Sequence, residues 1–216
     1  MSGAAPASMP PDPPVTSAGA PDWQNLPLFL LGTVLFPGGV LPLRVFEARY
    51  VDMMRACMKA GQPFGVCLIK EGSEVGAPAV PHEVGCLAHI VDFDMQQLGV
   101  INISTRGGGR FRVLETHAQA DGLVRAVAEA VADDPHTPVD AGFAVCALTL
   151  RAILPKIPPG MLPEPHLFDD ASWLSNRLTE ILPIQPLARQ RLMELPDPQM
   201  RLEIIHTYLR QQGLKA

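Results

Sequence analysis

Three consecutive glycines in "STRGGGRFRV", residues 107–109, form the segment whose composition is closest to a known chemical site. A glycine-rich loop can turn several backbone N–H groups toward a phosphate when it leads from a strand into a helix. Here the glycines lead into "RFRV", whose alternation of charged and apolar residues is typical of a strand. The sequence also lacks a G-x-x-x-x-G-K-[ST] segment. We therefore predict a hairpin or a β-bulge at these glycines, without a phosphate site.

Two pairs of residues have the chemistry of metal ligands or acid–base groups. Cys86 and His89 are three positions apart in a segment that resembles a strand, so their side chains point to opposite faces and cannot share one ion. Asp92 and Asp94 lie on one strand face, which would suit calcium or an acid–base pair, although a solvent-facing strand end is favoured. The six histidines form no H-x-x-x-H pair. The sequence therefore predicts no metal site and no cofactor.

Nucleophilic catalysis has no motif behind it. The sequence contains no Gly-x-Ser-x-Gly segment, and Ser104 and Ser172 lie where we expect a strand and the start of a helix. Triads assemble from residues that are distant in sequence. No pattern in this sequence indicates a catalytic triad, so we assign no catalytic residue.

Glu47 and Arg49 follow an apolar run in "FPGGVLPLRVFEARY", residues 36–50. In one interpretation Glu47 stabilises the first turn of a helix through the helix dipole, and Arg49 faces solvent. In the other, Glu47 turns inward and pairs with Arg110 or Arg112, because a buried charge needs a partner. Both interpretations give Glu47 an architectural role.

The strands that position these residues are indicated by short apolar runs. From Leu26 to about Val131 such runs alternate with Gly and Pro, which is typical of a small β-barrel or sandwich. The segments "LPLFLL" and "VLPLRVF" indicate the first two strands, joined by a turn at Pro37 and Gly38. "GVINIST" and "RFRVLE" indicate two further strands, and "GLVRAVAEAV" fits either a strand or a short helix.

One helix is expected among the strands, because the apolar residues of "FEARYVDMMRACMKAG" recur at helical spacing and Gly61 is placed to end it. Its apolar face comprises Phe46, Tyr50, Met53, Met54, Cys57 and Met58.

The chain divides into three parts by composition. Residues 1–25 hold many prolines and alanines and predict a disordered tail. Residues 26–137 form the β-rich part, and residues 138–216 show three apolar faces at helical spacing, which indicates a small helical subdomain. Asp197 and Pro198 suit the start of the last helix, and Gly213 its end.

Composition narrows the class of partner. The formal net charge of -5 disfavours nucleic acid. No apolar stretch approaches the ~18 to 20 residues of a membrane helix, and the N-terminal segment has no signal-peptide pattern, so we expect no membrane and a cytoplasmic location. The four cysteines form no Cys-x-x-Cys pair and indicate buried, reduced thiols.

The order of the motifs resembles a known family over about residues 26–212. "LPLRVFEARY" is similar to the L-P-L-x-x-F-E-x-R-Y signature, and "GGGRFRV" to the G-x-x-R-F signature, of the N-terminal substrate-binding domain of the ATP-dependent protease Lon. The resemblance implies an α+β fold, with a PUA-like β-barrel that contains one helix, followed by a small α-helical bundle. The family-motif residues are Pro37, Gly38, Glu47, Arg49, Tyr50, Gly109, Arg110 and Phe111.

The resemblance also implies a function. In Lon proteases this domain helps to recognise unfolded or tagged polypeptides and assists assembly, whereas the present chain ends before an ATPase or Ser-Lys protease domain. We therefore expect a stand-alone, non-catalytic module that binds unfolded or partner polypeptides, as an adaptor for proteolysis or protein quality control. Phe36, Met54 and Met58 are the candidate contacts, since flexible methionines suit adaptable surfaces.

Two alternatives remain open at the level of sequence. One is RNA binding through the arginines of the glycine turn, as in other PUA-like modules. The other is a small-molecule pocket or enzyme at the barrel mouth. The residues of the first are Arg106, Arg110 and Arg112, and those of the second are His89, Asp92 and Asp94. The oligomeric state stays open between a monomer and a homodimer.

Overall fold

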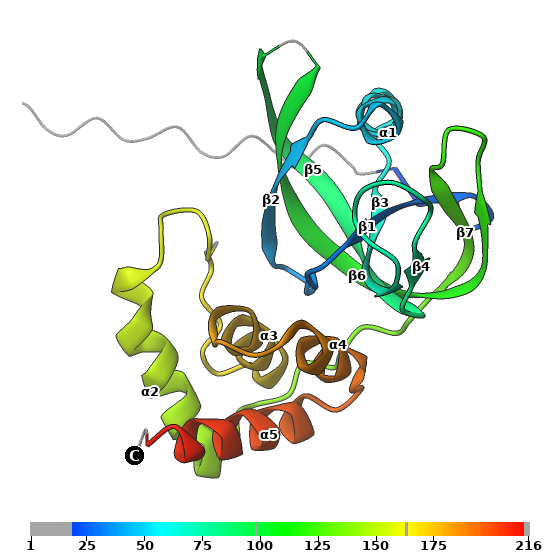
Figure 1. Cartoon of the computed structure of the whole chain (residues 1–216). Coiled ribbons are helices and arrows are strands. Elements are labelled where there is room, and N and C mark those ends of the chain that lie inside the picture. The colour runs from blue at the N-terminus through cyan, green and yellow to red at the C-terminus, as the bar shows by residue number, and fades with distance from the viewer. Residues whose placement is uncertain (1–18, 98, 163, 214–216) are drawn as a thin grey trace, which may run out of the picture.

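The computed structural model describes residues 19–97, 99–162 and 164–213 and has an α+β architecture (Figure 1). The strands are β1 (Leu26–Leu31), β2 (Val40–Val45), β3 (Phe64–Glu71), β4 (Val80–Pro81), β5 (Val84–Gln97), β6 (Val100–Ala118) and β7 (Val124–Ala130). The α-helices are α1 (Ala48–Ala60), α2 (Ala144–Ile153), α3 (Ala171–Ile181), α4 (Pro186–Glu194) and α5 (Pro198–Gln211). The predicted α+β class, with one helix inserted among the strands and helices after them, is confirmed.

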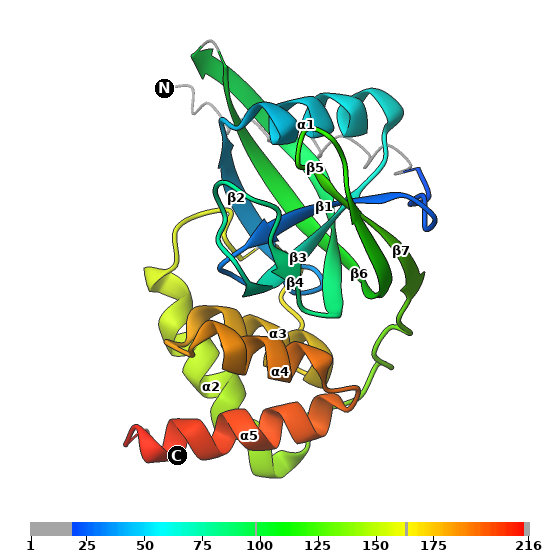
Figure 2. The same ribbon diagram turned by 45° about the vertical axis from the view of Figure 1, so that its right-hand side comes forward.

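The strands form a closed ring. β1, β7, β6, β5 and β3 follow one another around it, and a parallel pairing of β1 with β3 closes it. The other pairings are antiparallel, with β4 beside β3 and β2 beside β6. Figure 2 shows α1 above the ring and the C-terminal helices below it.

Helix α1 forms where the apolar period predicts it and ends as predicted at Gly61, whose φ of 63° is left-handed and suits glycine. Met53, Met54 and Cys57 face the ring and are buried. Phe46 was expected on the same face. It precedes the helix instead, and its side chain is 60% exposed.

The triple glycine lies inside a strand. The two segments that we expected as separate strands are parts of the single strand β6. A step of two residues on β5, from Cys86 to Ala88, faces a step of three on β6, from Arg110 to Gly107. This is the predicted β-bulge, since one extra residue stands on the β6 side. The ambiguous segment before Val131 is the strand β7.

Helices α3 and α4 attach the C-terminal region to the ring. Arg177 of α3 donates to the Pro37 carbonyl at 2.7 Å, and Gln190 of α4 donates to the Val84 carbonyl at 2.9 Å. Helix α4 was missed in the sequence, where we recognised three apolar faces. Its buried residues, among them Leu192 and Met193, pack partly against the ring, so the helix shows no regular apolar stripe of its own.

Arg110 connects the ring to the C-terminal region through several hydrogen bonds. Its guanidinium donates to the carbonyls of Met193 at 2.9 Å and Leu195 at 3.3 Å, and to that of Ala132 at 3.1 Å. It also pairs with the Asp134 carboxylate at 2.5 Å. Because Arg110 is 4% exposed, these contacts replace its lost hydration.

Asp134 extends this connection into the helices. Its second carboxylate oxygen accepts hydrogen bonds from Ser172 at 2.8 Å and from the guanidinium of Arg201 on α5. The Arg201 Nε–H donates in turn to the Ser175 hydroxyl at 3.0 Å. β6, the segment that follows β7, α3 and α5 therefore share one buried polar network.

Glu180 adds a titratable group to the same interface. Its carboxylate pairs with the Arg177 Nε at 3.1 Å and lies against Gly39 in the turn before β2. Burial raises the pKa of Glu180 to about 7, while Arg177, Arg189 and the Phe36 backbone act in the opposite direction.

This shift predicts the pH dependence of stability. Because the folded-state pKa lies above the ordinary value of 4.5, the stabilising contribution of the bound proton is complete below about pH 4.5 and is lost as the pH rises through about 7. Between pH 5 and pH 8, urea titrations should show the free energy of unfolding of the wild type falling by about 1 to 3 kcal/mol more than that of Glu180→Gln. Equal slopes for the two proteins would refute the assignment.

The predicted domain boundaries can be compared with the structure only in part. Residues 1–18 of the expected tail lie outside the described residues. From residue 19 the chain is described, and the carbonyl of Trp23 accepts a hydrogen bond from Ala128 of β7 at 2.8 Å. The division near residue 138 stays a prediction, consistent with separate apolar clusters for the ring and for the C-terminal helices.

Candidate functional site

Within the described part of the chain, two strand edges of the ring have no pairing strand on one side. β2 and β7 lie end to end along the same edge of β6, at residues 101–106 and 111–118. β1 pairs with β7 only through Leu26 and Pro27. Farther along β1, the edge that faces β2 therefore has no strand of the described residues beside it.

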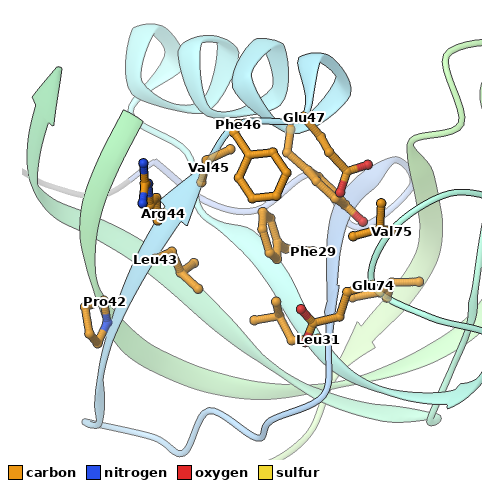
Figure 3. Close-up of a pocket in the computed structure, with 12 residues that line it drawn as sticks. Phe29, Leu31, Pro42, Leu43, Arg44, Val45, Phe46, Glu47, Glu74 and Val75 are labelled. Carbon is orange, nitrogen blue, oxygen red and sulfur yellow. The ribbon is translucent and has the colours of Figure 1, made fainter. Parts of the chain in front are cut away.

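A cleft of about 230 Å³ occupies this space (Figure 3). Figure 3 shows β2 on one side and the loop between β3 and β4 on the other, with Phe29 and Leu31 of β1 between them. Phe46 and Val75 stand at the rim and are 60% and 59% exposed. The lining residues are Phe29, Leu30, Leu31, Pro42, Leu43, Arg44, Val45, Phe46, Glu47, Tyr50, Glu74 and Val75.

Arg49 holds the loop wall in place. Its Nη1 donates to the carbonyls of Gly76 at 3.2 Å and Gly122 at 3.0 Å, and its Nη2 donates to that of Glu74 at 3.4 Å. Its charge is paired with Glu47 at 2.8 Å. A single buried guanidinium therefore connects the start of α1 to two loops.

This geometry corrects the placement of Arg49 in the first interpretation and the partner of Glu47 in the second. Arg49 does not face solvent, since its side chain is 7% exposed. Glu47 pairs with Arg49 and not with Arg110 or Arg112. Arg110 pairs with Asp134 instead. The physical reason is proximity: the turn that enters α1 brings two side chains of the same motif together.

The β1 side of the cleft is covered by side chains. Glu74 accepts a hydrogen bond from the Gly32 N–H at 2.5 Å. The Tyr50 ring packs on Phe29 with centroids 4.2 Å apart, and the Arg49 guanidinium lies 4.7 Å from the Tyr50 centroid. Burial raises the pKa of Tyr50, so its hydroxyl is neutral at physiological pH. The cleft is thus apolar at its floor and polar along the loop wall.

The model of the ATP-dependent protease La (LON) substrate-binding domain matches residues 25–211. The chain belongs to the Lon substrate-binding domain family. It resembles the crystal structure of a Lon N-terminal domain protein from Xanthomonas campestris, with a TM-score of 0.72 and 35% identity over 85% of this chain and 98% of that one. The N-terminal domain of a Mycobacterium avium complex Lon protease shares the fold, with a TM-score of 0.60 and 16% identity over 84% and 95% of the two chains.

Curated relatives are much longer than the matched region. A Lon protease of Xanthomonas oryzae pv. oryzae is 25% identical over 86% of this chain and 23% of its own length. Protein cereblon of Danio rerio is 31% identical over 52% of this chain and 27% of its own length. The chain therefore spans about a quarter of the length of these relatives.

The Lon-motif residues lie in three places. Glu47, Arg49 and Tyr50 line or support the cleft. Pro37, Gly38, Gly109 and Arg110 lie where the ring meets the helices, and Phe111 packs in a ring core, where its Cζ leaves no room for a Cβ on Gly65 or Gly85. Their assignment as family-motif positions with structural roles stays a prediction.

The predicted binding residues lie apart from the cleft. Phe36 and Met54 are fully buried in the ring core, each 0% exposed, because their side chains fill the space between α1, the turn before β2 and the strands. Neither side chain is accessible to a bound polypeptide. Met58 is partly buried on α1. The residues that sequence reasoning missed as cleft contacts are Phe46 and Val75, and no local pattern in the sequence marks either of them.

The other candidate sites from the sequence were a metal site and a pocket with acid–base groups. Among the described residues no group of three His, Cys, Asp or Glu side chains is placed to hold a metal ion. Asp92 and Asp94 are exposed on β5, and neither they nor His89 line the cleft. Burial raises the pKa of the Cys57 and Cys146 thiols to about 11, so both are protonated and poorly nucleophilic.

The arginines around the triple glycine do not form a free basic patch. Arg110 is buried and paired, and Arg112 lies between Glu83 at 3.8 Å and Glu129 at 3.9 Å. Arg106 is exposed. No helix in the described part of the chain is long and apolar enough to cross a membrane.

Proposed function

We propose that this chain is a non-catalytic polypeptide-binding module that holds an apolar side chain of an unfolded or partner polypeptide in the cleft. The observation that carries the proposal is the cleft itself, because a family of substrate-binding domains shares this fold and the cleft has exposed Phe46 and Val75 at its rim. An adaptor role in proteolysis or quality control is the biological context that we propose for that binding.

The size of the cleft favours a side chain over a small-molecule ligand. Its volume of about 230 Å³ is below the roughly 300–1,000 Å³ of pockets that enclose drug-sized ligands. One or two apolar side chains fill such a space. The RNA-binding alternative is weakened by the pairing of Arg110 and Arg112 with carboxylates.

Truncation of the rim tests the proposal. We expect Phe46→Ser to weaken binding of a labelled, permanently unfolded polypeptide by about tenfold, because a large exposed aromatic contact is lost. The measurement is fluorescence anisotropy with a folded protein of similar charge as the negative control. Leu148→Ser is the matched variant, since Leu148 is 62% exposed but lies on α2. Equal losses in both variants, or saturable binding to the folded control, would count against the cleft.

A further inference from the structure

The orientation of β2 decides which of its backbone groups are free. The Gly39 carbonyl accepts from the Gly107 N–H at 2.8 Å, and the Leu41 carbonyl accepts from the Thr105 hydroxyl at 2.8 Å. Both carbonyls therefore point toward β6. Because backbone groups along a strand alternate between its two sides, the even-numbered residues of β2 point away from β6 and toward the open edge.

This open edge is richer in acceptors than in donors. Val40, Pro42 and Arg44 present three carbonyls but only two N–H groups, because proline has none. Proline at an edge also discourages pairing with an identical edge of a second copy. An extended polypeptide of a different sequence can supply N–H groups to the free carbonyls.

The charges near the edge favour a basic segment. Glu74 is exposed on the opposite wall, Glu47 adds a second carboxylate that Arg49 neutralises, and the exposed Arg44 of β2 is a cation of the same lining. Figure 3 shows Leu43 directed toward Phe29, whereas Arg44 lies on the other side of β2. Free carbonyls and the Glu74 carboxylate thus both face the cleft, and both attract N–H donors and cationic side chains.

We propose, as a refinement that rests on the proposed function, that the bound segment adds to the free edge of β2 as an extended strand. Its apolar side chain enters the cleft beside Phe29 and Leu43, and a neighbouring lysine or arginine pairs with Glu74. Strand addition uses main-chain hydrogen bonds for affinity and pockets for alternate side chains for specificity. The partner is therefore a segment in which apolar and basic residues alternate.

The experiment uses the full chain and a labelled seven-residue peptide of alternating lysine and valine, followed by fluorescence anisotropy. In one version every valine carries a backbone N-methyl group, and in the other every lysine does. Each version therefore lacks the N–H groups along one edge of the extended peptide. We expect one version to bind at least about tenfold more weakly and the other to bind as the parent does. A glutamate–valine peptide should bind more weakly than the parent, and Glu74→Gln should reduce that preference.

Each result bears on a different level of the proposal. If both N-methylated versions bind as tightly as the parent, strand addition is wrong while polypeptide binding stands. If the two charged peptides bind equally, the preference for basic segments is wrong. If neither the peptides nor a permanently unfolded polypeptide binds, the proposed function itself fails. Arg44→Pro removes an N–H group that points away from β6 and breaks no bond to β6. This variant should bind the parent peptide more weakly than Arg44→Ala does, at an unchanged melting temperature.

Discussion

Gly107→Ala should lower the free energy of unfolding by more than about 4 kcal/mol or prevent folding, as measured by urea titration. A Cβ at this position would lie 2.0 Å from the Phe36 carbonyl oxygen. The strand cannot move away, because the Gly107 N–H donates to the Gly39 carbonyl at 2.8 Å and the Gly107 carbonyl accepts from Gly38 at 2.9 Å. The carbonyl oxygen and the carbonyl carbon of Phe36 are both backbone atoms, so no change of side-chain rotamer relieves the clash.

Gly109→Ala is the matched control in the same triple glycine. A Cβ there would meet only the Asp133 carboxylate oxygen at 3.5 Å, an ordinary contact. We expect a change within about 1 kcal/mol. Similar stabilities for the two variants would show that the close approach of the turn to β6 is not a constraint.

Arg110→Met is expected to cost about 3 to 5 kcal/mol of stability, because it leaves one oxygen of the buried Asp134 carboxylate and three backbone carbonyls without their donor. The variant leaves Asp134 with one arginine fewer and removes the donors to the carbonyls of Met193 and Leu195. Methionine keeps much of the side-chain volume, so the loss reports the polar contacts. Urea unfolding at pH 7 measures it.

Arg112→Met provides the comparison two residues along the same strand. Arg112 is 47% exposed, and its two carboxylate partners lie at 3.8 and 3.9 Å. Exposed pairs of this kind contribute at most about 1 kcal/mol. If Arg110→Met were as mild as Arg112→Met, the buried network would not be what joins the ring to the helices.

The sequence predicted those features that depend on local pattern. The apolar period of α1, its end at Gly61 and the start of α5 at Asp197 are all present, since each rests on residues within a few positions of one another. The Asp197 carboxylate accepts from the Gln199 N–H at 2.9 Å, as an N-cap should. The bulge at the triple glycine was one of two stated alternatives and is local as well.

The candidate cleft escaped prediction because it depends on which strand edges remain unpaired. That property follows from β2 and β7 sharing one edge of β6, and from Arg49 reaching Gly76, 27 residues away, to position the loop wall. The partner of Arg110 is 24 residues distant, and Asp134 reaches Arg201 over a further 67. Periodicity within one segment carries no information about such contacts.

Hydrogen exchange of the full chain, with and without a saturating, permanently unfolded polypeptide, shows whether the bound polypeptide covers the cleft. We expect slower exchange of the Arg44 amide at the open edge of β2 and in the loop between β3 and β4, with no change on the exposed face of α5. Saturable binding that leaves the cleft unprotected, or that protects α5 instead, would refute the proposed function.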